Sequence, residues 1–165
     1  MTTTIAAIRD RLKTVIESTA PTCPPTDAQD VWRYRPTRGQ SVEEWAMANA
    51  AACFRIFDIR RVGEVADAQG WQPDEIMRSD EQLALTVAYP RLPDLYGESY
   101  EAMEDCLRAD AAQLRNICVS PSTAAGVSGW SAVTGCTIAE PERGDIVWFQ
   151  RLVITLAYCE AQSLT

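Results

Sequence analysis

The sequence contains no histidine, so it lacks the side chain that most often performs acid–base catalysis near neutral pH. Its serine, threonine and cysteine side chains are therefore left without the base that usually activates them. The only lysine, Lys13, falls on the polar side of a predicted helix, outside the apolar pocket that activates a Schiff-base lysine. No glycine-rich phosphate loop follows a strand either. We therefore predict a protein that is not an enzyme and that binds no cofactor.

Metal-binding and membrane-spanning patterns are also missing. The six cysteines include no CxxC pair, and no histidine is present to complete a zinc site. No stretch approaches the ~20 apolar residues of a membrane-spanning helix. The start MTTTIAAIRDRLK lacks the basic-then-apolar order of a secretory signal. We expect no metal site, no membrane contact and a protein that is made in the cytoplasm.

Positive charge is scarce, because 15 basic residues stand against 23 acidic ones and the formal net charge is −8. Such a chain repels a polyanion, which argues against specific nucleic-acid binding. Apolar residues are plentiful, at 47% of 165 residues, and one domain of this size can bury a core without disulfides. We predict a single domain over residues 1–165, in which the proline-rich segment 19–40 forms an irregular arm or loop.

The reactive side chain that the sequence does contain is cysteine, at six positions. Cys23 lies in the polar, proline-rich stretch TAPTCPPTD and is predicted to be an exposed thiol, the candidate for oxidation or for linking subunits. The other five lie in or beside apolar segments and are expected to be small buried side chains in a reducing cytosol. Disulfide pairing remains the alternative, and six cysteines allow 15 connectivities.

Three segments carry the spacing of helices. Apolar residues recur every three or four positions over Thr4–Glu17, which predicts an amphipathic helix. Ser41 to Glu44 fits a capping box, so a short helix is expected to about Ala51. The best-defined helix runs from Ser99 to Cys118, with an apolar stripe made by Tyr100, Met103, Cys106, Leu107, Ala111, Leu114 and Ile117.

Four segments carry the pattern of strands, and a short edge strand is a further candidate at Val31–Arg35. The first two predicted strands are Cys53–Val62 and Leu83–Tyr89, separated by the long loop Gly63–Asp80. The last two are Trp130–Ala139 and Ile146–Glu160, joined by a turn rich in proline and glycine.

The order of these elements predicts an α+β fold. We expect an antiparallel or mixed four-stranded sheet with two main helices packed on it, in the order helix, short helix, two strands, helix, two strands. Leu83, Leu85, Val87 and Tyr89 share one face of their strand, and smaller residues occupy the other. This division suits a sheet that is covered on both faces.

The chain resembles the tail terminator, or tail completion, proteins of long-tailed bacteriophages. The likeness lies in the opening helix TTTIAAIRDRLKTVIES, the strand FRIFDIRRV with its excursion to LALTVAYPRL, the helix SYEAMEDCLRADAAQLRNI and the closing strand DIVWFQRLVITLAY. The likeness is one of chain length, order of the elements and general residue pattern, and it covers most of the chain. The family has no short invariant motif, so no functional residue is carried over.

The resemblance implies a structural virion protein located at the tail or neck and assembled in the host bacterial cytoplasm. It implies a homo-oligomeric ring, usually a hexamer, that caps the tail tube protein and joins it to a head-side neck or connector protein. DNA would pass through an acidic lumen without specific binding.

Arginines at strand ends and large residues in loops are the candidates for subunit contacts in such a ring. The predicted interface consists of Trp32, Arg35, Arg55, Arg60, Arg61, Trp71 and Met77. Three alternatives to a tail terminator remain. They are another neck or head-completion protein, a small-ligand-binding or regulatory α+β domain of a bacterial cytosol, and a metal-dependent hydrolase that uses acidic residues alone.

Overall fold

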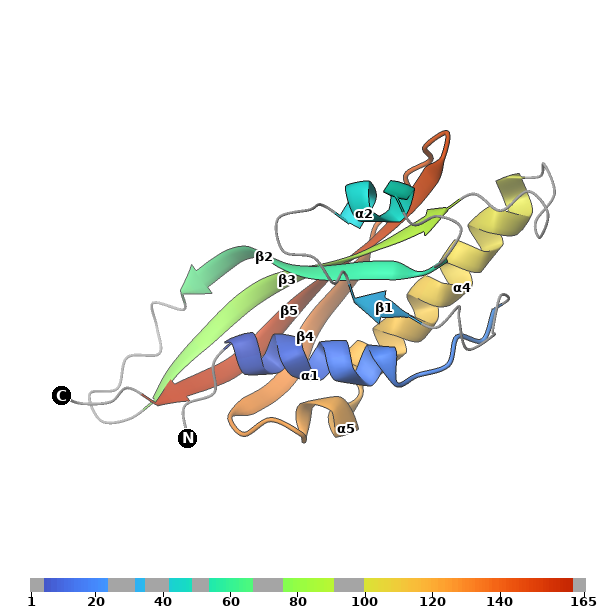
Figure 1. Cartoon of the computed structure of the whole chain (residues 1–165). Helices are drawn as coiled ribbons and strands as arrows, with labels where there is room; N and C mark the ends of the chain where they lie inside the picture. Colours follow the sequence, from blue (N-terminus) through green and yellow to red (C-terminus); the bar gives the residue numbers. More distant parts are fainter. Residues whose placement is uncertain are drawn as a thin grey trace.

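A computed structural model of the chain describes residues 5–23, 32–34, 42–48, 54–66, 76–90 and 100–161. These residues form one mixed five-stranded sheet with the strand order β1-β2-β3-β5-β4. Two main helices cover one face of the sheet, and a short helix lies against the other face (Figure 1). The predicted α+β class is confirmed.

The helices lie close to their predicted positions. They are α1 (Ile5–Glu17), α2 (Val42–Ala48), α4 (Tyr100–Val119) and α5 (Pro121–Ala124). The strands are β1 (Arg33–Tyr34), β2 (Ile56–Ala66), β3 (Ile76–Pro90), β4 (Trp130–Ile138) and β5 (Val147–Ala161). The short α5 begins at Pro121, and a proline suits the first turn of a helix.

The sheet has five strands where four were predicted. The additional strand is β1, which comes from the segment recognised in the sequence as a candidate edge strand. It pairs in parallel with the start of β2, where Arg33 is opposite Ile56 and Tyr34 is opposite Phe57. A parallel pair needs a crossover, and α2 lies within the connection between β1 and β2.

Half of the loop Gly63–Asp80, predicted between the first two strands, is strand. β2 continues to Ala66 and β3 begins at Ile76, and the two pair as an antiparallel hairpin. The register shifts between Arg61 and Gly63, so the two-residue period breaks there. Because of this irregularity and the charged residues around it, the sequence shows no regular alternation here, and this part of the strand was not predicted. Residues 67–75 lie outside the described residues.

The centre of the sheet is the antiparallel pair β3–β5, which runs from Ile76 opposite Ala161 to Pro90 opposite Val147. Its inner face meets the apolar stripes of α1 and α4. The predicted face of β3 is buried, and so is most of the predicted stripe of α4, although Tyr100 is exposed. The principal core side chains are Ile8, Leu12, Ile16, Phe57, Leu83, Leu85, Val87, Tyr89, Leu107, Leu114, Trp148, Leu152 and Ile154.

Among the described residues, the second face of the sheet is covered at one end by α2. Val42 and Ala46 of α2 pack there against Ile56, Ala88 and Val147, forming a separate small core. Further along the same face of β5, Arg151 is exposed, Val153 and Thr155 are partly exposed, and Ala157 is buried. Both faces of the sheet therefore carry a helix, as expected, and the described cover on this face is the seven-residue α2.

Candidate functional site

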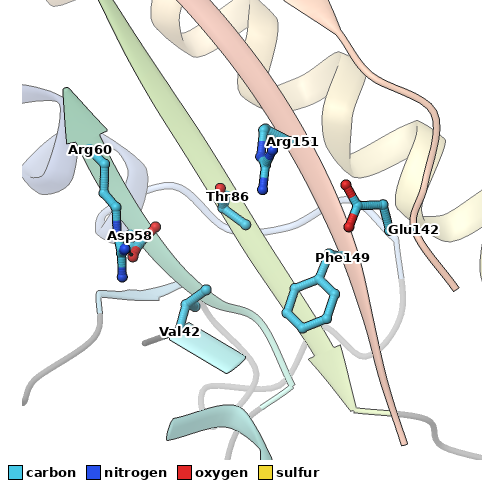
Figure 2. A pocket seen from close by; sticks show the side chains of 7 residues that line it. All are labelled: Val42, Asp58, Arg60, Thr86, Glu142, Phe149 and Arg151. Atoms are coloured by element: carbon cyan, nitrogen blue, oxygen red, sulfur yellow. Dashed lines mark hydrogen bonds and ion pairs between the residues drawn. The ribbon is translucent and has the colours of Figure 1, made fainter. Parts of the chain in front are cut away.

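A hollow of about 300 Å³ lies on the α2 side of the sheet, next to the small second core. Figure 2 shows side chains from β2, β3 and β5 standing around it, with α2 along one side. It is lined by Val42, Asp58, Arg60, Thr86, Glu142, Phe149 and Arg151.

Strand register explains why these side chains meet. Asp58 pairs with Thr86, and Thr86 pairs with Arg151, so the three form a row across β2, β3 and β5. Directly paired residues of neighbouring strands point to the same face of a sheet. The central strand carries only small side chains on this face, because Ala84 and Ala88 flank Thr86. The floor of the hollow is therefore low, and the larger side chains of β2 and β5 form its walls.

The charges around the hollow are balanced, two arginines against two carboxylates. Arg60 donates through Nε to Asp58 Oδ2 at 2.8 Å; the Asp58 side chain is buried, and that of Arg60 is about half exposed. Across the described ranges, the Arg151 side chain forms no ion pair. A group that carries negative charge and an apolar part could lie between the Arg151 guanidinium and the Phe149 ring.

Among the described residues that line the hollow, Thr86 is the only one with a hydroxyl side chain. The Asp58 carboxylate is paired with Arg60, and Glu142 is exposed. Among the described residues, no three side chains of histidine, cysteine, aspartate or glutamate are grouped to hold a metal ion. What the arrangement can do chemically is bind a polar group.

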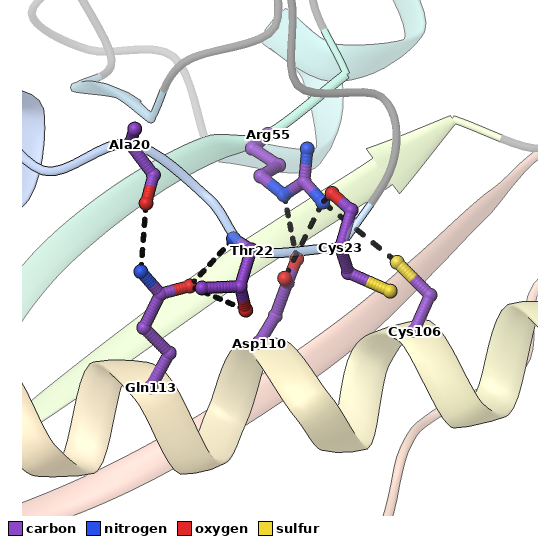
Figure 3. Close-up of polar contacts among 7 residues, drawn as sticks. All are labelled: Ala20, Thr22, Cys23, Arg55, Cys106, Asp110 and Gln113. Atoms are coloured by element: carbon purple, nitrogen blue, oxygen red, sulfur yellow. Dashed lines mark hydrogen bonds and ion pairs between the residues drawn. The ribbon is translucent and has the colours of Figure 1, made fainter.

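A second polar cluster is buried beneath α4, on the opposite face of the sheet. Arg55 is fully buried and pairs with Asp110 through two contacts, Nε to Oδ2 at 2.6 Å and Nη2 to Oδ1 at 3.3 Å. Its Nη2 also donates to the main-chain oxygen of Cys23 at 2.6 Å and contacts Cys106 Sγ at 3.8 Å (Figure 3). The rings of Trp32 and Phe54 lie 5.3 and 5.0 Å from the guanidinium carbon.

Burial and the ion pair set the protonation of this cluster. Burial works to lower the pKa of Arg55, but the hydrogen bond and the charge of Asp110 outweigh it, so the pKa is raised. Burial raises the pKa of Tyr89 well above its ordinary value, and the charge of Asp110 raises it further. The cluster therefore keeps Arg55 charged and Tyr89 neutral, which suits a structural anchor.

The anchor and α4 hold the start of the proline-rich segment. Gln113 donates through Nε2 to the oxygen of Ala20 at 2.7 Å. Its Oε1 accepts from the backbone N–H of Thr22 at 3.1 Å. Together with the bond from Arg55 to Cys23, these contacts fix residues 20–23 along α4 (Figure 3).

Two of the predicted interface residues lie inside the fold. Trp32 is 1% exposed and belongs to the main core, and Arg55 is fully buried. Both were predicted as surface anchors, and the structure contradicts that position for each. Arg55 directly precedes β2 and lies beneath α4, so it pairs with Asp110 and does not reach solvent.

The remaining predicted residues are dispersed. Arg60 and Arg61 are about half exposed; Arg61 pairs with Glu81, which also accepts from the Tyr158 hydroxyl at 3.1 Å. Met77 lies in β3, but its side chain is not among those described, and Arg35 and Trp71 lie outside the described residues. The predicted exposed thiol, Cys23, is half-buried and packs against the main core.

Sequence reasoning missed the residues that organise both clusters. Asp110 occupies a position of the apolar stripe of α4, one turn from Leu107 and Leu114, and a carboxylate there signals a buried cation. Thr86 and Arg151 gave no comparable signal, because their meeting depends on the pairing of β3 with β5.

In the part of the chain that the structure describes, no helix is long and apolar enough to cross a membrane. No known protein family matches the sequence, and no curated protein matches it.

Proposed function

We propose that the chain is a non-catalytic subunit that works by assembly, as a homo-oligomeric ring at the tail–neck junction of a long-tailed bacteriophage. The feature that best supports this proposal is a sheet longer than the helices that cover it. β3 and β5 have 15 residues each and span about 50 Å, at ~3.3 Å per residue. α4 has 20 residues and spans about 30 Å, at ~1.5 Å per residue.

One end of the sheet therefore projects beyond the helical layer. The end of β2, the beginning of β3 and the end of β5 extend past the first turn of α1 (Figure 1). Val62 stands at the approach to this end, where the register of β2 shifts, and it is 56% exposed. A projecting sheet end offers a neighbouring subunit an area to pack on, which is what a ring contact needs.

Direct extension of the sheet through β4 is less suitable for assembly. β4 is an edge strand, and its pairing with β5 shifts register twice, between Trp130 and Ala132 and between Val133 and Gly135. Bulges of this kind make an edge strand less able to pair with a strand of another chain. The proposed contact is therefore the projecting end, with Arg60 and Arg61 beside it.

The charge of the chain fits the proposed partners. A ring built from subunits of net charge −8 would present a negative field to DNA, which could pass through the lumen without adhering. The two faces of the ring would contact a tail tube protein and a head-side neck protein. Because such contacts are spread over surfaces, no single side chain is expected to be indispensable.

Sedimentation velocity and electron microscopy of the purified chain test the proposal. We expect a discrete ring-shaped oligomer that binds the ends of purified tail tubes. A chain that remains monomeric at high concentration, and that does not bind tail tubes, would contradict it.

The hollow on the α2 side favours one second candidate, a small-ligand-binding domain. Its volume of about 300 Å³ is at the lower end for ligand pockets, and its lining is mixed instead of mainly apolar. A thermal-shift screen of small organic anions distinguishes the two functions. An upward shift that Arg151→Gln abolishes would support ligand binding, whereas the ring proposal expects no such shift.

A further inference from the structure

Two cysteines from distant parts of the sequence meet at the Arg55 guanidinium. Cys23 belongs to the segment that follows α1, and Cys106 lies on α4. The same Nη2 atom contacts the main-chain oxygen of Cys23 at 2.6 Å and Cys106 Sγ at 3.8 Å. Figure 3 shows the two sulfur atoms at the facing ends of their side chains. Neither cysteine is in a disulfide in this structure.

The surroundings of the two sulfurs suit an exchange reaction. The attacking species in thiol–disulfide exchange is the thiolate. Cys23 is half-buried, so a small reagent can reach its sulfur, while Cys106 is only 1% exposed. The accessible cysteine can therefore react first, and the enclosed cysteine can complete the bond.

We propose that Cys23 and Cys106 are a redox-sensitive pair that forms a reversible disulfide with a low-molecular-weight disulfide as oxidant. The Cys23 thiolate attacks one sulfur of the oxidant, which forms a mixed disulfide and releases one small thiolate. The Cys106 thiolate then attacks the Cys23 sulfur and releases the second. The protein loses two electrons, the oxidant is reduced to two thiols, and these take up the two protons that the cysteines lose.

The bond would act on the junction between α1, the proline-rich segment and α4. Residues 20–23 are already held on α4 by Gln113 and by Arg55, so the bond fastens an existing contact. It would close a loop from residue 23 to residue 106, and long loops give a disulfide its largest effect on the unfolded chain. The reduced form would persist in a reducing cytosol and the bonded form in an oxidising medium. The proposal does not depend on ring formation.

Peptide mapping of the wild-type chain after exposure to oxidised glutathione tests the proposal. Trypsin cleaves after Lys13, Arg33, Arg91 and Arg108, so the two cysteines fall in the separate peptides 14–33 and 92–108. We expect a linked pair of these peptides that dithiothreitol separates. We also expect the midpoint of thermal unfolding to rise by about 5–15 °C on oxidation.

Cys23→Ser and Cys106→Ser should each abolish the linked peptides and the thermal shift. The matched control is Cys118→Ser, since Cys118 is equally buried on α4 and away from Arg55; it should leave the linked peptides unchanged. The proposal is overturned if the wild-type chain forms no 14–33 to 92–108 link. It is also overturned if oxidation stops at a glutathione adduct on Cys23, or if the only bond joins Cys118 to Cys136.

Discussion

At the scale of single residues, the most important polar contact within the core is the buried ion pair between Arg55 and Asp110. Both side chains are fully buried, and the contact is bidentate. A buried pair of this kind adds little net stability, but removing one partner leaves a charge without compensation. The pair therefore matters most for positioning, because it ties β2, α4 and Cys23 to one another.

Replacing one partner of this pair should destabilise the chain strongly. We expect Asp110→Ala to lower the free energy of unfolding by about 3–5 kcal/mol, measured by urea denaturation. The control is Glu104→Ala, which removes a surface carboxylate from the same helix and should change the midpoint little. The double variant Arg55→Met with Asp110→Leu should recover most of the loss. Equal midpoints for Asp110→Ala and Glu104→Ala would contradict this account.

The buried thiol of Cys118 should make stability depend on alkaline pH. Burial raises its pKa from 9.0 to about 12, and the neighbouring Cys136 thiol adds to the effect. The folded chain then binds this proton more tightly than the unfolded chain. The contribution is complete below pH 9 and is lost as the pH rises toward 12, by up to roughly 1.4 kcal/mol per pH unit.

Cys118→Ala should therefore flatten the alkaline part of the stability profile. The measurement is the free energy of unfolding between pH 8 and pH 10.5, under reducing conditions, for the variant and the wild type. The slopes of the two profiles should differ by at most ~1.4 kcal/mol per pH unit. Cys23→Ser serves as the control, because it removes a thiol that is only half-buried. Parallel profiles for wild type and Cys118→Ala would exclude this thiol as the cause.

At the scale of elements, the turn between β4 and β5 depends on a close backbone approach. A Cβ atom added at Gly144 would meet the Val147 oxygen at 2.3 Å, and a backbone oxygen cannot swing away as a side chain can. The turn is further held by reciprocal backbone bonds between Glu142 and Phe149, at 2.8 and 2.9 Å. The predicted turn residues thus set both the bend and one wall of the hollow.

Gly144→Ala should consequently destabilise the chain by about 1–3 kcal/mol, because the backbone of the turn must shift. The matched variant is Gly135→Ala, where an added Cβ would make only ordinary contacts with Thr155, the nearest at 3.7 Å. We expect that variant to unfold at or slightly above the wild-type midpoint. Thermal denaturation of the two variants compares them, and equal losses would contradict the close approach.

At the scale of the whole molecule, the projecting sheet end is the surface that the proposed ring would use. Val62→Glu should weaken self-association while leaving the thermal midpoint near that of the wild type, since Val62 is mostly exposed. The control is Val119→Glu, which places the same charge at a second exposed valine, at the end of α4. Sedimentation velocity measures both. If the two variants associate equally well, the contact lies elsewhere.

The sequence by itself determined the class of fold and most of its elements. Helical spacing located α1 and α4, a capping box located α2, and the alternation of Leu83, Leu85, Val87 and Tyr89 identified the buried face of β3. These patterns are local, because each depends on residues a few positions apart in one element. The sequence alone likewise shows that histidine, the most common acid–base side chain near neutral pH, is absent.

Only the tertiary structure decided which polar residues lie inside and what they contact. Arg55 was expected at the surface but is buried, because its partner Asp110 comes from a helix 55 positions along the chain. The row of Asp58, Thr86 and Arg151 depends in the same way on register across three strands. Such meetings are set by the packing of α4 on the sheet and by strand pairing. Residue spacing along the sequence does not encode them.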